Sequence, residues 1–217
     1  MIDIVREIEA VERETGPGRL GGSDARTVSL RRTYAAPIGE VWDALTNPER
    51  IGRWFLPVSG DYRIGGSYQF EGNAGGVIVA CDAPHRLRVT WVYGPQGDAP
   101  PSEVEVRLTG AGDDSTILEL EHVAVVPDEF WDQYGPGAVG VGWEGGALGL
   151  ALHLSGGSVG DPLAWQVSDE GREFNTRSSV AWGEASRAAG ADGQTVARYV
   201  ASTTAFYAPE PEAAGAD

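Results

Sequence analysis

The stretch VSLRRTYAAPIGEVWDALTNPERIGRWFLP, residues 28–57, contains the pattern that decides the fold. Its first part predicts a strand over 27–34, because apolar residues recur there on one face. Pro37 is suited to the start of a helix, and an apolar stripe follows it at helical spacing: Ile38, Val41, Trp42 and Leu45. A second short helix is expected after Asn47-Pro48, with three apolar residues: Ile51, Trp54 and Phe55. One strand and two short helices are therefore predicted.

From Pro57 onward, apolar and polar residues alternate, which is the period of a strand with one buried face. Val104, Val106 and Leu108, for example, are separated by charged residues. Turn-forming residues divide the alternating segments, at 65–66, 72–76, 82–84, 94–101 and 110–114. The sequence therefore predicts an antiparallel meander whose other face is exposed to water, followed by a short helix after Pro127.

The segment GVGWEGGALGLALHL, residues 140–154, predicts a largely buried helix, because apolar side chains surround most of its axis. Its Gly-x-Gly-x-x-Gly spacing also occurs in dinucleotide-binding turns, which need a preceding parallel strand and an acidic residue about 20 positions later. The preceding strands are expected to be antiparallel, and Asp161, at about that distance, lies in a linker rather than at a strand end, so nucleotide binding is rejected. Glycine destabilises a helix interior, so its repeated use indicates either close packing or a cavity beside the helix. The glycines are Gly140, Gly142, Gly145, Gly146 and Gly149.

The pattern divides the chain into four parts. Residues 1–26 are expected to form an amphipathic helix over 2–14 and a flexible, glycine-rich linker. Residues 27–157 form the main domain. Residues 158–208 are expected to add a helical hairpin, with Ser168 and Asp192 as N-caps of its two helices. Residues 209–217 are expected to be a disordered tail.

Composition restricts the partners of the protein. The formal net charge is -16 at pH 7, so nucleic acids and anionic membranes are not expected as partners. Cys81 is the single cysteine, so the chain has no internal disulfide, and no segment resembles a signal peptide or a membrane-spanning helix. A cytoplasmic protein is therefore expected.

The order of strand, two short helices, meander and long helix resembles the helix-grip fold of the START-like (SRPBCC) superfamily. The branch that the chain resembles contains the C-terminal domain of the activator of the heat-shock-protein-90 ATPase. The resemblance covers about residues 27–157, in the segments VSLRRTYAAPIGEVWDALTNPERIGRWFLP, GGSYQFEG, HRLRVTWVY, STILELEHVAV and VGVGWEGGALGLALHL. It implies an α+β fold in which a curved antiparallel sheet grips the long helix, and the predicted C-terminal hairpin lies outside that core.

The resemblance also implies an apolar cavity between sheet and long helix, with an entrance near the two short helices. The candidates for its lining are residues of matching parity or position: Trp54, Phe55, Tyr68, Phe70, Trp91, Tyr93, Leu118, Leu120 and Trp143. Tyrosine and tryptophan combine a large apolar area with one polar group, which suits a pocket for an amphipathic molecule.

Catalytic and metal sites have little support in the sequence. His85, His122 and His153 have no metal-like spacing, so no metal and no cofactor is expected. His122 extends an inward row, so it could act as an acid or base in the cavity, or be a rim histidine bonded to a loop. Glu144 interrupts the apolar helix, and is either exposed to solvent or buried as a proton donor or acceptor for a ligand.

Two further residues have alternative interpretations. Arg32 lies on the inward side of the first strand, where it could bind a ligand carboxylate or pair with Glu40 or Glu144. Cys81 alternates with valines and is expected to be a small buried thiol.

Three functions are consistent with these observations. The first is a protein that encloses a small apolar or aromatic molecule beneath the long helix. The second is a cyclase- or hydratase-type enzyme that uses His122 or Glu144. The third is an interaction protein, either associated with a chaperone or dimerising through the hairpin at 158–208.

Overall fold

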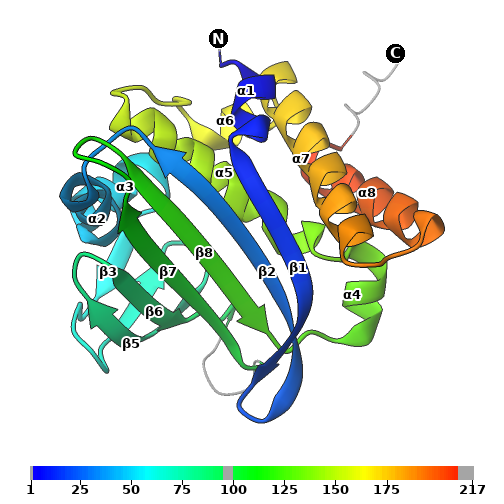
Figure 1. The fold of residues 1–217 in the computed structure, drawn as a ribbon, viewed down its shortest axis with the longest axis horizontal. Coiled ribbons are helices and arrows are strands. Elements are labelled where there is room, and N and C mark those ends of the chain that lie inside the picture. The colour runs from blue at the N-terminus through cyan, green and yellow to red at the C-terminus, as the bar shows by residue number, and fades with distance from the viewer. Residues whose placement is uncertain (1, 95–99, 210–217) are drawn as a thin grey trace, which may run out of the picture.

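The computed structural model describes residues 2–94 and 100–209, and Figure 1 shows a curved sheet packed on a long helix. Within the described residues the sheet has eight strands in the order β1-β2-β8-β7-β6-β5-β4-β3, and every neighbouring pair is antiparallel. The strands are β1 Val11–Leu20, β2 Ser23–Tyr34, β3 Val58–Gly60, β4 Ser67–Phe70, β5 Gly75–Asp82, β6 Arg86–Thr90, β7 Ser102–Gly110 and β8 Thr116–Ala124. The antiparallel meander is confirmed.

The helices surround the concave side and one end of this sheet (Figure 1). The long helix α5 lies behind the strands, α2 and α3 lie at one end, and α7 runs beside β1. The helices are α1 Ile4–Glu9, α2 Ile38–Thr46, α3 Pro48–Trp54, α4 Asp128–Tyr134, α5 Gly137–Leu154, α6 Pro162–Gln166, α7 Asp169–Ala188 and α8 Gly193–Tyr207. The predicted α+β helix-grip architecture is confirmed.

The N-terminal segment differs from the prediction of a helix over 2–14 and a flexible linker up to residue 26. Only Ile4–Glu9 is helical, and β1 then pairs with β2 from Val11 opposite Arg32 to Leu20 opposite Ser23. The two residues between the strands, Gly21 and Gly22, have φ values of 58° and 86°. Positive φ at both positions of a two-residue loop is the requirement of a tight hairpin, so these glycines turn the chain rather than loosen it. The sheet therefore begins at Val11.

The glycines of α5 serve two purposes, on different sides of the helix. A Cβ atom on Gly140 would lie 2.3 Å from the ring of Trp182 in α7, and one on Gly149 would lie 2.5 Å from the carbonyl oxygen of Trp54. These two positions allow close packing. Gly146 instead faces the space between sheet and helix, where a Cβ atom would lie 3.8 Å from Phe55. Close packing and a cavity beside the helix are thus both present.

The C-terminal helices lie where the hairpin was expected, with the short helix α6 as an unpredicted addition. The Ser168 hydroxyl accepts a hydrogen bond from the N–H of Gly171, and the Asp192 carboxylate accepts from the N–H groups of Gln194 and Thr195. Both residues are therefore N-caps, as predicted. Except for Pro209, the predicted disordered tail over 209–217 lies outside the described residues. No described helix has both the length and the apolar character needed to cross a bilayer.

Candidate functional site

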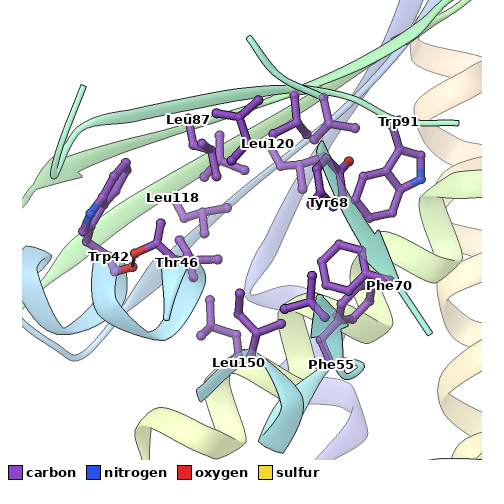
Figure 2. Close-up of a pocket in the computed structure, with 18 of the residues that line it drawn as sticks. Trp42, Thr46, Phe55, Tyr68, Phe70, Leu87, Trp91, Leu118, Leu120 and Leu150 are labelled. Atoms are coloured by element: carbon purple, nitrogen blue, oxygen red, sulfur yellow. Dashed lines mark hydrogen bonds between the residues drawn. The ribbon is translucent and has the colours of Figure 1, made fainter. Parts of the chain in front are cut away.

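A cavity of about 490 Å³ lies between the sheet and α5. Its walls come from α2 and α3, from the inward faces of β2 to β8, and from one side of α5. Figure 2 shows the side chains of these elements converging on one space, with Leu118, Leu120 and Leu150 between an aromatic group on one side and Trp42 and Thr46 on the other.

Eight of the nine residues expected in the lining are on the cavity wall. They are Trp54, Phe55, Tyr68, Phe70, Trp91, Leu118, Leu120 and Trp143. Tyr93 is not on the wall, and 61% of its surface is exposed. The regular strand β6 ends at Thr90, and only a single bridge between Gly75 and Val92 pairs the chain beyond it. The alternation that correctly placed Trp91 therefore does not extend to Tyr93.

A β-bulge in β5 changes which residues of that strand reach the cavity. The pairing of β5 with β6 shifts between Ile78 and Ala80, so alternation along the strand is interrupted. As a result Ile78 and Cys81 line the cavity, whereas strict alternation predicted Val77, Val79 and Cys81 on one face. Cys81 is exposed rather than buried, so the expectation for its thiol was wrong.

The cavity opens beside the connection between β3 and β4. Tyr62 and Ile64 of this connection line the cavity, yet 48% and 60% of their surfaces are exposed, which places them at its mouth. Arg63 lies between them and forms an ion pair with Asp61, with 2.6 Å between Nε and Oδ2. The mouth follows α3 in the chain, so it lies close to the entrance that the sequence predicted.

Aromatic rings form a continuous contact network along one side of the cavity. Phe55 and Phe70 meet edge to face at 5.0 Å between ring centroids, and Phe70 lies 5.5 Å from Trp91. Trp91 lies 4.7 Å from Trp143 of α5. These separations fall in the range of favourable aromatic pairs, so the sheet and α5 are joined across this side of the cavity by rings.

The hydroxyl groups in the wall donate to backbone carbonyls. The hydroxyl of Tyr34 donates to the carbonyl of Ala147 at 3.1 Å, and that of Tyr68 donates to the carbonyl of Thr90 at 2.7 Å. Burial raises the pKa of both tyrosines, so both stay protonated and neutral. The hydroxyl of Thr46 donates within α2, to the carbonyl of Trp42.

His122 lies behind the wall, not on it. The indole N–H of Trp143 donates to Nδ1 of His122 at 3.0 Å, and Nε2 is 2.7 Å from the hydroxyl of Ser102. Because Nδ1 accepts, the ring proton is on Nε2 and the imidazole is neutral. Burial lowers the pKa of His122 to about 4. The interpretations as a cavity acid or base and as a loop-bonded rim residue are both wrong, because the histidine orients a wall tryptophan from within the core.

Glu144 is buried, which excludes the alternative of solvent exposure, but it faces away from the cavity. Only 1% of its surface is exposed. Nε of Arg13 donates to Oε2 at 2.9 Å, Nη2 of Arg13 donates to Oε1, and the hydroxyl of Ser178 donates to Oε2 at 2.8 Å. This carboxylate therefore joins β1, α5 and α7. Arg13 was missed because residues 2–14 were interpreted as a helix.

Arg32 pairs with neither of the two carboxylates considered from the sequence, nor does it line the cavity. Its guanidinium forms an ion pair with Glu7 of α1 and lies 5.3 Å from the ring centroid of Tyr34. Its role is to attach α1 to the sheet. Among the described residues, no group of three His, Cys, Asp or Glu side chains is arranged to hold a metal ion.

The comparisons with known proteins agree with the fold. The family described as Activator of Hsp90 ATPase homolog 1-like protein matches residues 35–151. The crystal structure of CalU16 from Micromonospora echinospora is similar to this chain at 36% identity and a TM-score of 0.63, covering 82% of this chain and 99% of that one. The solution structure of CalU16 gives 36% identity and a TM-score of 0.66, covering 83% and 97%.

A more distant structure, protein MLL2253 from Mesorhizobium loti, has 24% identity and a TM-score of 0.52, and covers 60% of this chain and 97% of that one. It supports the fold alone. No curated protein matched the chain. The match over residues 35–151 spans the short helices, the meander and most of α5, and so contains nearly all of the cavity wall. The chain belongs to the family of Activator of Hsp90 ATPase homolog 1-like proteins.

Proposed function

We propose that this protein binds a small, largely apolar and aromatic molecule in the cavity between the sheet and α5. The observation that carries the proposal is a cavity of about 490 Å³ with an open mouth and a wall built almost entirely of apolar and aromatic side chains. Binding pockets for small molecules are typically about 300–1,000 Å³ and have this kind of lining. An unfilled apolar cavity destabilises a folded protein, and a ligand would offset that cost.

The enzyme hypothesis loses the two residues on which it depended. His122 is separated from the cavity by Trp143, and Glu144 points toward Arg13 and Ser178 on the other side of α5. Neither side chain lines the cavity, so neither supports acid or base chemistry on a molecule bound there.

The dimerisation hypothesis is also weakened, because the apolar side of the C-terminal hairpin is used within the chain. Phe174 and Trp182 of α7 and Val196 and Tyr199 of α8 are buried. Most of the apolar face that a partner would require is therefore covered by the protein itself, although Phe206 of α8 is 64% exposed.

The test uses N-phenyl-1-naphthylamine, an uncharged dye whose fluorescence increases in apolar surroundings. Its titration should give saturable binding to the unchanged protein. Gly146→Leu should weaken the binding at least about tenfold, because the new side chain extends into the cavity from a position where its Cβ only touches Phe55.

The matched control is Gly145→Leu, the same change one residue earlier in α5. A Cβ atom there meets nothing within 4 Å, and the position is not on the wall. Both changes raise helix propensity equally. Equal dye binding by the two variants, with both folded, would refute the proposal.

A further inference from the structure

The hydroxyl groups of the cavity wall donate to carbonyl groups of the protein, and this restricts what the cavity can hold. The hydroxyl groups of Tyr34, Tyr68 and Thr46 each donate to a carbonyl oxygen. At the mouth, the Tyr62 hydroxyl donates to the carbonyl of Val58, and Arg63 is paired with Asp61.

The four tryptophans of the wall offer no inward donor either. The indole N–H of Trp54 donates to the carbonyl of Ala44 at 3.0 Å, and that of Trp143 donates to His122. Figure 2 shows the ring nitrogens of Trp42 and Trp91 on the outer sides of their rings, away from the other labelled residues. A carbonyl, ether or carboxylate oxygen inside the cavity would therefore find no hydroxyl or indole donor. The other donors of the lining are the weak thiol donor of Cys81 and the guanidinium of Arg63 at the mouth.

The wall does retain hydrogen-bond acceptors. A hydroxyl group that donates its only hydrogen keeps two lone pairs, so Tyr34, Tyr68 and Thr46 remain acceptors. All three residues are on the wall, and the two tyrosines stay neutral because burial raises the pKa of each. The polar groups that the wall offers a ligand are thus uncharged hydrogen-bond acceptors.

We infer that the cavity selects an uncharged aromatic molecule whose polar substituent is a hydrogen-bond donor, such as a phenol or an aromatic amine. This rests on the proposed function and names the chemistry of its ligand. A molecule of the same size that carries only acceptors leaves Tyr34, Tyr68 and Thr46 unused. A carboxylate is rejected more strongly, because burying a charge without donors is costly and the chain itself has a net charge of -16.

The experiment measures how well three naphthalenes displace N-phenyl-1-naphthylamine at neutral pH: 2-naphthol, 2-methoxynaphthalene and 2-naphthoate. A hydrogen bond contributes enough that 2-naphthol should bind about 3- to 10-fold more tightly than its methyl ether. The ether is the more apolar of the two, so apolar burial alone predicts the reverse order. The naphthoate should bind at least about 10-fold more weakly than the ether.

Conservative variants identify the acceptor. One of Tyr34→Phe, Tyr68→Phe and Thr46→Val should abolish the preference for 2-naphthol, because each change removes the acceptor oxygen and keeps the rest of the side-chain shape. The matched control is Tyr207→Phe, which removes a hydroxyl that also donates to a carbonyl, that of Ala138, but is not on the cavity wall; it should keep the preference. Circular dichroism establishes that each variant is folded.

The outcomes separate the two claims. If the dye does not bind, the proposed function fails and this inference fails with it. If the dye binds but the three naphthalenes bind with equal affinity, or if Tyr34→Phe, Tyr68→Phe and Thr46→Val all keep the preference, only the inference is overturned. Tight naphthoate binding that Arg63→Gln removes would assign the mouth arginine as an anion site and would also overturn it.

Discussion

His122 illustrates how one buried residue fixes a wall of the cavity. It accepts from Trp143 at one ring nitrogen and lies within hydrogen-bond distance of Ser102 at the other. Both contacts suit the neutral ring, and a second proton on Nδ1 would face the indole N–H of Trp143. The orientation of Trp143, and with it part of the cavity wall, therefore depends on the charge state of a residue that does not touch the cavity.

A dependence of stability on pH follows from this arrangement. The unfolded chain takes up a proton on His122 near pH 6.5, whereas burial delays protonation of the folded protein to about pH 4. Between these values the unfolded state binds more protons, so the stabilising contribution is complete above pH 6.5 and is lost as the pH falls toward 4. The loss amounts to about 3 kcal/mol.

Urea unfolding of the wild type and His122→Gln over pH 4–7 measures this contribution. The difference in unfolding free energy between the two proteins should change with pH in that window, since carboxylates common to both cancel. Parallel curves would show that His122 does not titrate as described.

At the residue scale, the sequence correctly predicted which side chains point into the cavity where a strand is regular, and failed where the strand is irregular. Leu118 and Leu120 lie in β8, which pairs without interruption on both sides, and their inward direction follows from alternation. Ile78 and Tyr93 lie at a bulge and beyond a strand end. Neither feature has a signal in the local pattern of apolar residues, because both depend on how the neighbouring strand pairs.

At the scale of elements, α5 is a helix with two functional sides. One side faces the cavity through Gly146 and Leu150, and the other side packs on the C-terminal helices through Gly140. The apolar composition of this helix correctly predicted that it is buried on both sides. The sequence could not predict which glycine faces which neighbouring element, because that depends on the position of α7.

An added methyl group should have opposite effects at Gly140, which packs on α7, and at Gly145, which is neither at that contact nor on the cavity wall. Gly140→Ala should destabilise the protein by about 1–3 kcal/mol, because its Cβ would lie 2.3 Å from the Trp182 ring. Gly145→Ala should stabilise it by about 0.5–1 kcal/mol through helix propensity, since its Cβ meets nothing. Urea denaturation of both variants checks the pair, and a stabilised Gly140→Ala would show that α7 yields at this contact.

The buried carboxylate of Glu144 attaches α5 to β1 and α7. Glu144→Ala leaves the guanidinium of Arg13 without its partner, which should destabilise the protein by about 3–5 kcal/mol. Ser178→Ala removes one hydrogen bond to the charge and should cost about 1.5–3 kcal/mol.

Dye binding distinguishes this structural role from a role in the cavity. Under conditions where the variants remain folded, their affinity for N-phenyl-1-naphthylamine should equal that of the wild type. A lower affinity in folded Ser178→Ala would mean that the contact shapes the cavity after all.

At the scale of the whole molecule, the N-terminal segment is part of the sheet. The apolar spacing of its first residues fits a helix, and Gly21-Gly22 fits a linker, so local pattern alone predicted an appendage. The pairing of β1 with β2 and the ion pair of Arg13 with Glu144 are long-range contacts, which explains why the boundary at residue 27 was wrong. The later boundaries depend on helix N-caps and helix-breaking residues, which can be recognised from the local sequence.

Removal of residues 1–22 therefore should not leave an intact domain. The truncated chain would expose the edge of β2 and leave Glu144 buried without Arg13. We expect self-association and a lower unfolding midpoint, measured by light scattering after gel filtration and by thermal circular dichroism. A monomeric truncated protein with the stability of the full chain would contradict this expectation.

The closeness of Trp91 and Trp143, 4.7 Å between ring centroids, has a spectroscopic consequence. Two indoles at this separation couple their electronic transitions, which produces an exciton couplet in the ultraviolet dichroism of the folded protein. One ring belongs to the sheet side and the other to α5, and both touch the same internal space. Any bound ligand that shifts α5 relative to the sheet would alter this couplet. Ligand binding could therefore be followed by circular dichroism without attaching a label.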